Sequence, residues 1–229
     1  WQEGSEKKSV TAPLSLVVSA FAATPDVRKH VTPQLRTDEG ETRLILVDIG
    51  FGKNRLGASS LAQVYEQVGN EVPDAPSAAQ LAAFFNALQS FIESGWVLAY
   101  HDRSDGGLFA TLCEMAFAGR TGIDVSLPQG EALAQLFNEE AGVVMQIRAE
   151  HAESVLAVLE NAGLPAMNIG TLAGDDRIRL SAGGNTVLDE SRADLLSAWW
   201  ETSHRIARLR DNPACADQEF ARCKEAADP

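Results

Sequence analysis

The residues best suited to chemistry are seven consecutive ones, His101 to Gly107, with the sequence HDRSDGG. Asp102 and Asp105 offer oxygen ligands of the kind that a hard cation such as Mg²⁺ takes. Ser104 offers a hydroxyl group to a phosphate or a ribose, and the two glycines let the backbone approach a ligand closely. The segment therefore has the composition of a loop that binds a metal–phosphate ligand.

This segment falls between an expected strand at 96–100 and an expected helix at 107–118. The first turn of a helix has free N–H groups and a partial positive charge, which suit a phosphate. A plainer interpretation stands beside this one. Asp105 belongs to the residue types that commonly cap a helix, and His101 can be a strand-end residue without a role. From these residues alone, a ligand loop and a simple strand-to-helix turn both remain open.

Three other segments carry weaker signals. Gly50–Lys53 (GFGK) lacks the spacing of a phosphate-binding loop, and Leu56–Ser59 at the start of an expected helix has amides that could face an anion. We interpret both as turns. Phe137–Glu140 brings two carboxylates together, as an acid–base pair would. Because the sequence names no partner for them, a solvated turn is the favoured interpretation.

The expected elements alternate along the chain. Strands are predicted at 14–22, 42–49, 96–100, 123–127, 142–148, 167–172, 177–181 and 185–188, and helices at 59–68, 78–94, 107–118, 151–161 and 191–210. The apolar run of 42–49 is nearly continuous, which is typical of a central strand covered on both faces. In helix 78–94, Ser77 and Gln80 can form a capping box, and apolar residues from Leu81 to Ile92 share one face. The pattern predicts an α/β (or α+β) domain with layers of helices on a mixed sheet.

Composition excludes several classes of function. The formal charge is −13, from 19 basic and 32 acidic residues, whereas nucleic acids and anionic membranes require basic patches. No run of about 18 apolar residues suggests a membrane span. The three cysteines are odd in number and show no zinc-binding spacing. A reduced cytoplasmic protein is the simplest interpretation. The chain opens on Trp1 rather than Met, which is expected of a piece of a longer protein, although processing of the N-terminus would give the same result.

Several segments together resemble one family. Tyr100–Leu108 is similar to a signature of the large, single-chain phosphoribosylformylglycinamidine synthases. Further matching segments are Thr11–Leu16, Ile45–Gly50, Leu56–Ser59, Leu136–Glu140 and Arg208–Pro213. The resemblance covers essentially the whole chain, and the combination is more specific than any one segment. In that family two homologous halves each resemble aminoimidazole ribonucleotide synthetase, and this chain looks like the C-terminal domain of the second half.

The resemblance implies a fold, a set of boundaries and an activity. The fold would be the partly ferredoxin-like sandwich of that superfamily over residues 13–210. Residues 1–12 would link it to a preceding domain, and residues 211–229 would lead toward a glutaminase domain. Members of the family are enzymes, namely ATP-dependent glutamine amidotransferase ligases of purine biosynthesis. It converts formylglycinamide ribonucleotide, glutamine and ATP to the formylglycinamidine, glutamate, ADP and phosphate.

The resemblance also assigns two site residues. Asp102 matches a position that ligates Mg²⁺, and Ser104 matches one that contacts the nucleotide, ATP or ADP. The other metal ligands would lie in the preceding domain, and the glutaminase machinery in another, so the fragment alone is expected to be inactive. In this family one nucleotide site is catalytic and a related one is structural, and both remain open for this loop. Asp105 is left as the expected helix cap.

An alternative of a different class is a non-catalytic interaction module with the same fold. It would dock on other domains through the helix faces near Phe84–Phe91 and Trp199–Trp200. Reading the gene beyond both ends of this chain separates the two hypotheses. A glutaminase domain downstream favours the synthase, and stop codons near both ends favour a free module.

Overall fold

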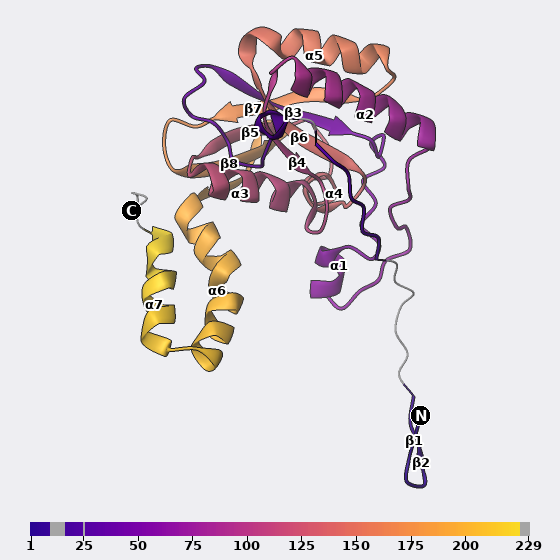
Figure 1. Ribbon diagram of the computed structural model, residues 1–229, viewed down its shortest axis with the longest axis vertical. Coiled ribbons are helices and arrows are strands. Elements are labelled where there is room, and N and C mark those ends of the chain that lie inside the picture. Colours follow the sequence, from indigo (N-terminus) through magenta and orange to yellow (C-terminus); the bar gives the residue numbers. More distant parts are fainter. Residues whose placement is uncertain (10–16, 25, 225–229) are drawn as a thin grey trace.

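A seven-stranded mixed sheet forms the centre of the molecule (Figure 1). The computed structural model describes residues 1–9, 17–24 and 26–224. The sheet has the strand order β4-β6-β3-β7-β5-β8-β9, and neighbours are antiparallel except for the parallel pair β5–β8. Its strands are β3 (Thr42–Asp48), β4 (Val97–Asp102), β5 (Ile123–Leu127), β6 (Gly142–Arg148), β7 (Ala166–Leu172), β8 (Arg177–Ala182) and β9 (Asn185–Ser191). The α/β class with a mixed sheet is therefore confirmed.

Strand β3 lies between β6 and β7 and contributes to two hydrophobic cores. Successive side chains of a strand point to opposite faces of the sheet. Leu44 and Leu46 accordingly lie in one core, and Ile45 and Val47 lie in the other. This arrangement explains why the apolar run is nearly continuous, and it confirms the predicted central strand.

Helices cover both faces of the sheet. Helices α2 and α5 lie on one face and α3 lies on the other (Figure 1). The helices are α1 (Ser60–Val64), α2 (Ala78–Glu93), α3 (Gly107–Gly119), α4 (Ala132–Phe137), α5 (Ala149–Asn161), α6 (Arg192–Arg210) and α7 (Pro213–Ala221). Short elements complete the described chain: the paired strands β1 (Gln2–Glu3) and β2 (Glu6–Lys7), and the 3₁₀ turns η1 (Val27–Lys29) and η2 (Arg222–Lys224). None of the helices in these described ranges is long and apolar enough to cross a membrane.

The capping box of α2 is present as predicted. The Ser77 hydroxyl accepts a hydrogen bond from the Gln80 amide at 3.2 Å, and the Gln80 side chain accepts one from the Ser77 amide at 2.9 Å. The predicted apolar face is only partly buried. Phe84 and Phe91 lie in the core, whereas Phe85 is 58% exposed.

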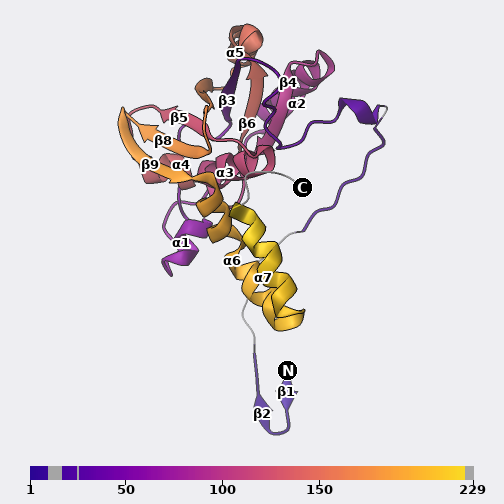
Figure 2. The same ribbon diagram turned by 90° about the vertical axis from the view of Figure 1, so that its left-hand side faces the viewer.

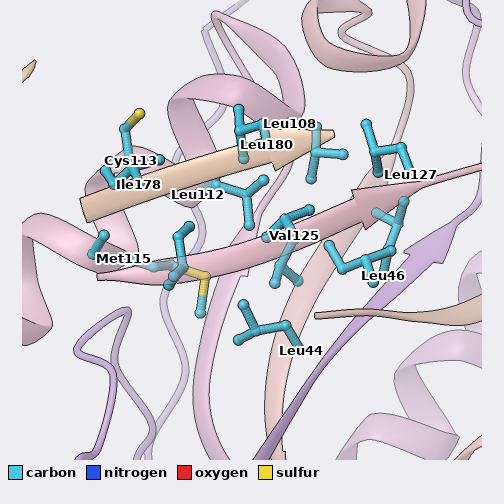
Figure 3. Close-up of a cluster of buried hydrophobic side chains, with 14 of the residues drawn as sticks. Leu44, Leu46, Leu108, Leu112, Cys113, Met115, Val125, Leu127, Ile178 and Leu180 are labelled. Atoms are coloured by element: carbon cyan, nitrogen blue, oxygen red, sulfur yellow. The ribbon is translucent and has the colours of Figure 1, made fainter. Parts of the chain in front are cut away.

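Helix α3 packs on β3, β5 and β8 through the larger of the two cores (Figure 3). Leu108 and Leu112 of α3 are each 1% exposed, and they lie among Val125 of β5 and Leu180 of β8. This packing fixes where α3 begins, and α3 begins directly after the HDRSDGG segment. The packing of α3 in this core therefore fixes the C-terminal end of the loop.

The strand predicted at 14–22 is wrong over its described part. Residues 17–22 have no regular structure, and Val17 and Phe21 are 90% and 97% exposed; residues 14–16 lie outside the described residues. A β-branched run becomes a strand only where a sheet edge accepts it. The outer edge of β4 is instead contacted by the segment around Thr32, whose carbonyl accepts a hydrogen bond from the Tyr100 amide at 3.0 Å.

Helix α1 is shorter than the predicted 59–68. It ends at Val64, and Glu66 takes a left-handed conformation with φ of 55°. The Val68 carbonyl then accepts a hydrogen bond from the Ala58 amide at 2.6 Å, so the chain folds back on the start of the helix. A tertiary backbone contact ends the helix before its sequence pattern does.

Helix α7 lies within residues 211–229, the polar segment that we expected to lead toward a glutaminase domain and for which we predicted no helix. Asn212 caps it, accepting a hydrogen bond from the Ala214 amide at 3.0 Å, and Pro213 occupies the first turn. Proline at the first helical position after an Asn cap is a recognised helix start. That signal was available in the sequence, but the polar composition of the segment hid it. Figure 2 shows α7 running back along α6.

We predict that Leu112→Ala lowers the free energy of unfolding by about 2–5 kcal/mol, because it removes buried methyl groups and leaves a cavity. Leu133→Ala is the matched control, since Leu133 is 53% exposed, and it should change stability by no more than about 0.5 kcal/mol. Urea denaturation followed by circular dichroism measures both. Equal effects of the two substitutions would contradict the assignment of this core.

Candidate functional site

The loop that joins β4 to α3 has one buried side chain among exposed ones. Arg103 is 5% exposed, whereas Asp102, Ser104 and Asp105 are all exposed. The buried Arg103 side chain therefore holds the loop on its inner side. The carboxylates of Asp102 and Asp105 and the hydroxyl of Ser104 lie on its outer, exposed side. The two site residues predicted from the sequence, Asp102 and Ser104, both lie on this outer side.

Arg103 anchors the loop with bonds to two neighbouring strand ends. Its Nη2 donates to Asp48 Oδ1 at 2.5 Å and to the Ala141 carbonyl at 3.0 Å, and its Nε donates to the Glu140 carbonyl at 2.7 Å. Its backbone amide donates to the Gly142 carbonyl at 2.7 Å. Charge-assisted bonds of this kind are stronger than neutral ones and fix a planar guanidinium in one orientation.

Asp48 in turn organises the GFGK segment. Its carboxylate accepts hydrogen bonds from the Gly50 amide at 3.2 Å and from the Gly52 amide at 2.6 Å. Both amides are directed at a side chain of the protein itself rather than at an open space. The segment is a turn wrapped around Asp48, as the sequence interpretation favoured.

Phe137–Glu140 is not the solvated turn that we predicted. The Glu140 side chain is 1% exposed, and Arg55 donates to its two oxygens from Nε at 2.5 Å and from Nη2 at 3.0 Å. Asn138 is fully buried and donates to the Ala134 carbonyl at 2.7 Å. The prediction failed because the cation that neutralises Glu140 is 85 residues away in the chain.

Glu139 joins the loop to the start of α1. Its Oε1 accepts hydrogen bonds from the Gly106 amide at 2.9 Å and from the Ser60 amide at 2.8 Å. Other amides of the preceding segment are also engaged, since the Gly57 amide donates to the Glu71 carbonyl at 2.7 Å. The segment Leu56–Ser59 is therefore a turn, as its sequence interpretation favoured.

Asp105 is not the cap of α3, and that prediction is wrong. Gly106 occupies the N-cap position with φ of 81° and supplies no side-chain cap. Gly107 follows with φ of 66°, and a Cβ atom there would lie 2.7 Å from the carbonyl oxygens of both Leu136 and Asn138. The two glycines are thus required by a sharp turn and by close packing of the loop on Phe137–Glu140.

Hydrogen bonds orient the residues on either side of the anchor. The Tyr100 hydroxyl donates to Asp102 Oδ1 at 2.5 Å. Burial and the neighbouring carboxylate raise the pKa of Tyr100 well above its usual range, so its hydroxyl remains a donor. His101 pairs with Glu114 of α3 at 2.7 Å between Nε2 and Oε2, so its ring contacts the helix.

The described residues do not form a complete metal site. They contain no cluster of three or more His, Cys, Asp or Glu side chains that could hold a metal ion. The cysteines are free, with Cys113 and Cys223 buried and Cys215 exposed. Asp102 would supply at most a small part of the coordination shell of Mg²⁺, which takes about six oxygen ligands.

The surfaces proposed for docking have mixed exposure. Trp199 is 56% exposed and its ring centroid lies 6.2 Å from that of Phe117. Trp200 lines a groove of about 360 Å³ between α6 and α7. Neither ring lies in the two described cores.

Residues 43–183 match the family model described as "AIR synthase related protein, C-terminal domain". This span is more than half of the chain and contains the loop with Arg103, the β3 turn and the Phe137–Glu140 segment. The chain therefore belongs to the family of AIR synthase related proteins through their C-terminal domain.

Solved structures with the same fold include PurL of Thermotoga maritima. The chain aligns with PurL complexed with ATP at a TM-score of 0.57 and 16% identity, over 72% of this chain and 27% of that one. It aligns with PurL complexed with FGAR at a TM-score of 0.59 and 14% identity, over 74% and 30% of the two chains. A third match is phosphoribosylformylglycinamidine synthase II of the same organism, with a TM-score of 0.57 and 16% identity over 72% and 27%. These likenesses show the fold, and this chain spans less than a third of the length of these three matched chains.

We predict that Gly107→Ala destabilises the protein more than Gly163→Ala does. Both glycines have a left-handed backbone, but a Cβ atom at Gly163 meets nothing within 4 Å. The difference isolates the contact of Gly107 with two carbonyl oxygens and should amount to about 1–3 kcal/mol. Thermal and urea unfolding of the two variants measure it. Equal losses would show that the loop does not pack closely on Phe137–Glu140.

Proposed function

We propose that this chain is part of a phosphoribosylformylglycinamidine synthase and forms one side of its Mg–nucleotide site. The observation that carries the proposal is the arrangement of the HDRSDGG loop. Arg103 holds the loop from inside, while Asp102 and Ser104 are exposed on its outer side. An anchored loop with an exposed carboxylate and an exposed hydroxyl is suited to a ligand that another domain also contacts.

Each exposed residue has a role in this proposal. Asp102 is a ligand of Mg²⁺, and Tyr100 holds its carboxylate in place through Oδ1. Ser104 contacts the nucleotide, ATP or ADP. When bound, Mg²⁺ neutralises phosphate charge and orients the phosphates. The residues of this chain fit that group as donors of one carboxylate and one hydroxyl, and the remaining ligands would come from a preceding domain.

The overall activity belongs to a larger protein in this proposal. Three observations support it: the family membership, the similarity of the fold to PurL complexed with ATP and with FGAR, and the short span of the chain within those proteins. The complete enzyme would be cytoplasmic and would use ATP and glutamine to convert formylglycinamide ribonucleotide to the formylglycinamidine. The preceding synthetase domain and a glutaminase domain would be the partners of this chain. The domain would span residues 13–210.

We predict that Asp102→Asn in the complete polypeptide weakens Mg–nucleotide binding at least about tenfold, because a contact to a charged partner contributes about 1.5–3 kcal/mol. The substitution keeps an oxygen that accepts the Tyr100 bond, so the fold should be unchanged. Calorimetry with Mg-ADP and the nucleotide content of the purified protein measure the effect.

Asp105→Asn is the matched control, because Asp105 is an exposed carboxylate of the same loop. It should bind Mg-ADP as the unmodified protein does. Unchanged affinity and nucleotide content in Asp102→Asn would overturn the role of Asp102. Equal losses in both variants would show that the loop acts only through its net charge.

A further inference from the structure

The second anchor of the HDRSDGG loop is a single carboxylate oxygen. Glu139 Oε1 accepts the Gly106 amide at 2.9 Å and the Ser60 amide at 2.8 Å. Gly106 ends the loop, two residues after Ser104, and Ser60 is the first residue of α1. One carboxylate oxygen therefore links the far end of the loop to the start of α1.

The backbone segment that carries Glu139 is held in place independently of the Glu139 side chain. The residues on both sides of Glu139 are buried, and each has its own bonds: Asn138 donates to the Ala134 carbonyl, and Glu140 pairs with Arg55. The Glu139 side chain itself is half-buried and lies outside the two hydrophobic cores. Its removal should leave the segment in place and release only the two amides that it holds.

Two of the three exposed residues of the loop lie between the two anchors, and the third, Asp102, precedes Arg103. Arg103 fixes the loop at its start and Glu139 fixes it at Gly106, so Ser104 and Asp105 are the two residues between them. If the Glu139 bond is lost, only one side of this short span stays fixed. A contact that orients a ligand-bearing group typically matters about 10- to 100-fold in affinity, even though it does not touch the ligand.

We propose that Glu139 is a positioning residue for the HDRSDGG loop on the nucleotide-binding side of the domain, and that it acts through the amides of Gly106 and Ser60. The inference rests on the function proposed above, because it assumes that Asp102 and Ser104 face a Mg–nucleotide. Glu139 does not contact the nucleotide or the metal. It sets the conformation in which the loop meets them and links that conformation to the position of α1.

The test compares three variants of the complete polypeptide with Mg-ADP as the probe, measured by calorimetry. Glu139→Ala should weaken binding about 10- to 100-fold without loss of the folded state in circular dichroism. Glu139→Gln should restore binding to within about fivefold, because a carboxamide oxygen still accepts both amide bonds, although less strongly than a carboxylate. Glu153→Ala removes an exposed carboxylate of α5 and should bind Mg-ADP normally.

Three results would overturn the inference: normal binding by Glu139→Ala, equal loss in the Ala and Gln variants, or unfolding of Glu139→Ala, which would make the residue merely structural. Asp102→Asn, measured in parallel, separates this inference from the proposed function. Normal binding by Asp102→Asn contradicts the proposed role of Asp102. A loss in Asp102→Asn beside normal binding in Glu139→Ala contradicts the positioning role alone.

Discussion

The buried ion pair between Arg103 and Asp48 is the interaction on which the candidate site depends. Arg103 follows β4 and Asp48 ends β3, and these strands are separated in the sheet by β6. The guanidinium must therefore cross the end of β6. It crosses at Gly142, the register partner of Asp48, where a Cβ atom would lie 3.0 Å from the guanidinium carbon. The absence of a side chain at Gly142 is what allows the pair to form.

A buried ion pair is weak evidence for stability, because removing two charges from water costs about as much as their attraction returns. Its consequence here is specificity of conformation. Once Arg103 is engaged with Asp48 and with two carbonyl groups, the residues beside it point outward. Asp102 and Ser104 are then available to a ligand on the surface. The pair thus fixes Asp102 and Ser104 on the exposed side of the loop. Glu139 holds the far end of the loop through its bond with the Gly106 amide.

Most of the sheet could be predicted from local patterns, whereas the network around the site could not. The apolar run of β3 and the capping box before α2 are local signals, and the structure contains both elements as predicted. The pairs Arg103–Asp48 and Arg55–Glu140 join residues 55 and 85 positions apart, so no local pattern indicates them. For that reason Phe137–Glu140 was interpreted as solvated, and Arg103 was not distinguished from its neighbours. The strand prediction for 14–22 failed for a different reason: its described part, residues 17–22, pairs with no strand of the described chain.

The prediction of Asp102 and Ser104 came from resemblance, and the geometry is compatible with it because both side chains are exposed. The central claim is that this anchored loop presents Asp102 to a metal shared with a nucleotide. The most direct test is anomalous diffraction from crystals of the complete polypeptide grown with Mn²⁺ and ADP, since Mn²⁺ takes the same carboxylate ligands as Mg²⁺. We expect an Mn²⁺ peak within about 2.5 Å of an Asp102 carboxylate oxygen, from an ion that also contacts the ADP phosphates. An Mn–ADP complex bound with Asp102 outside its coordination shell would contradict it.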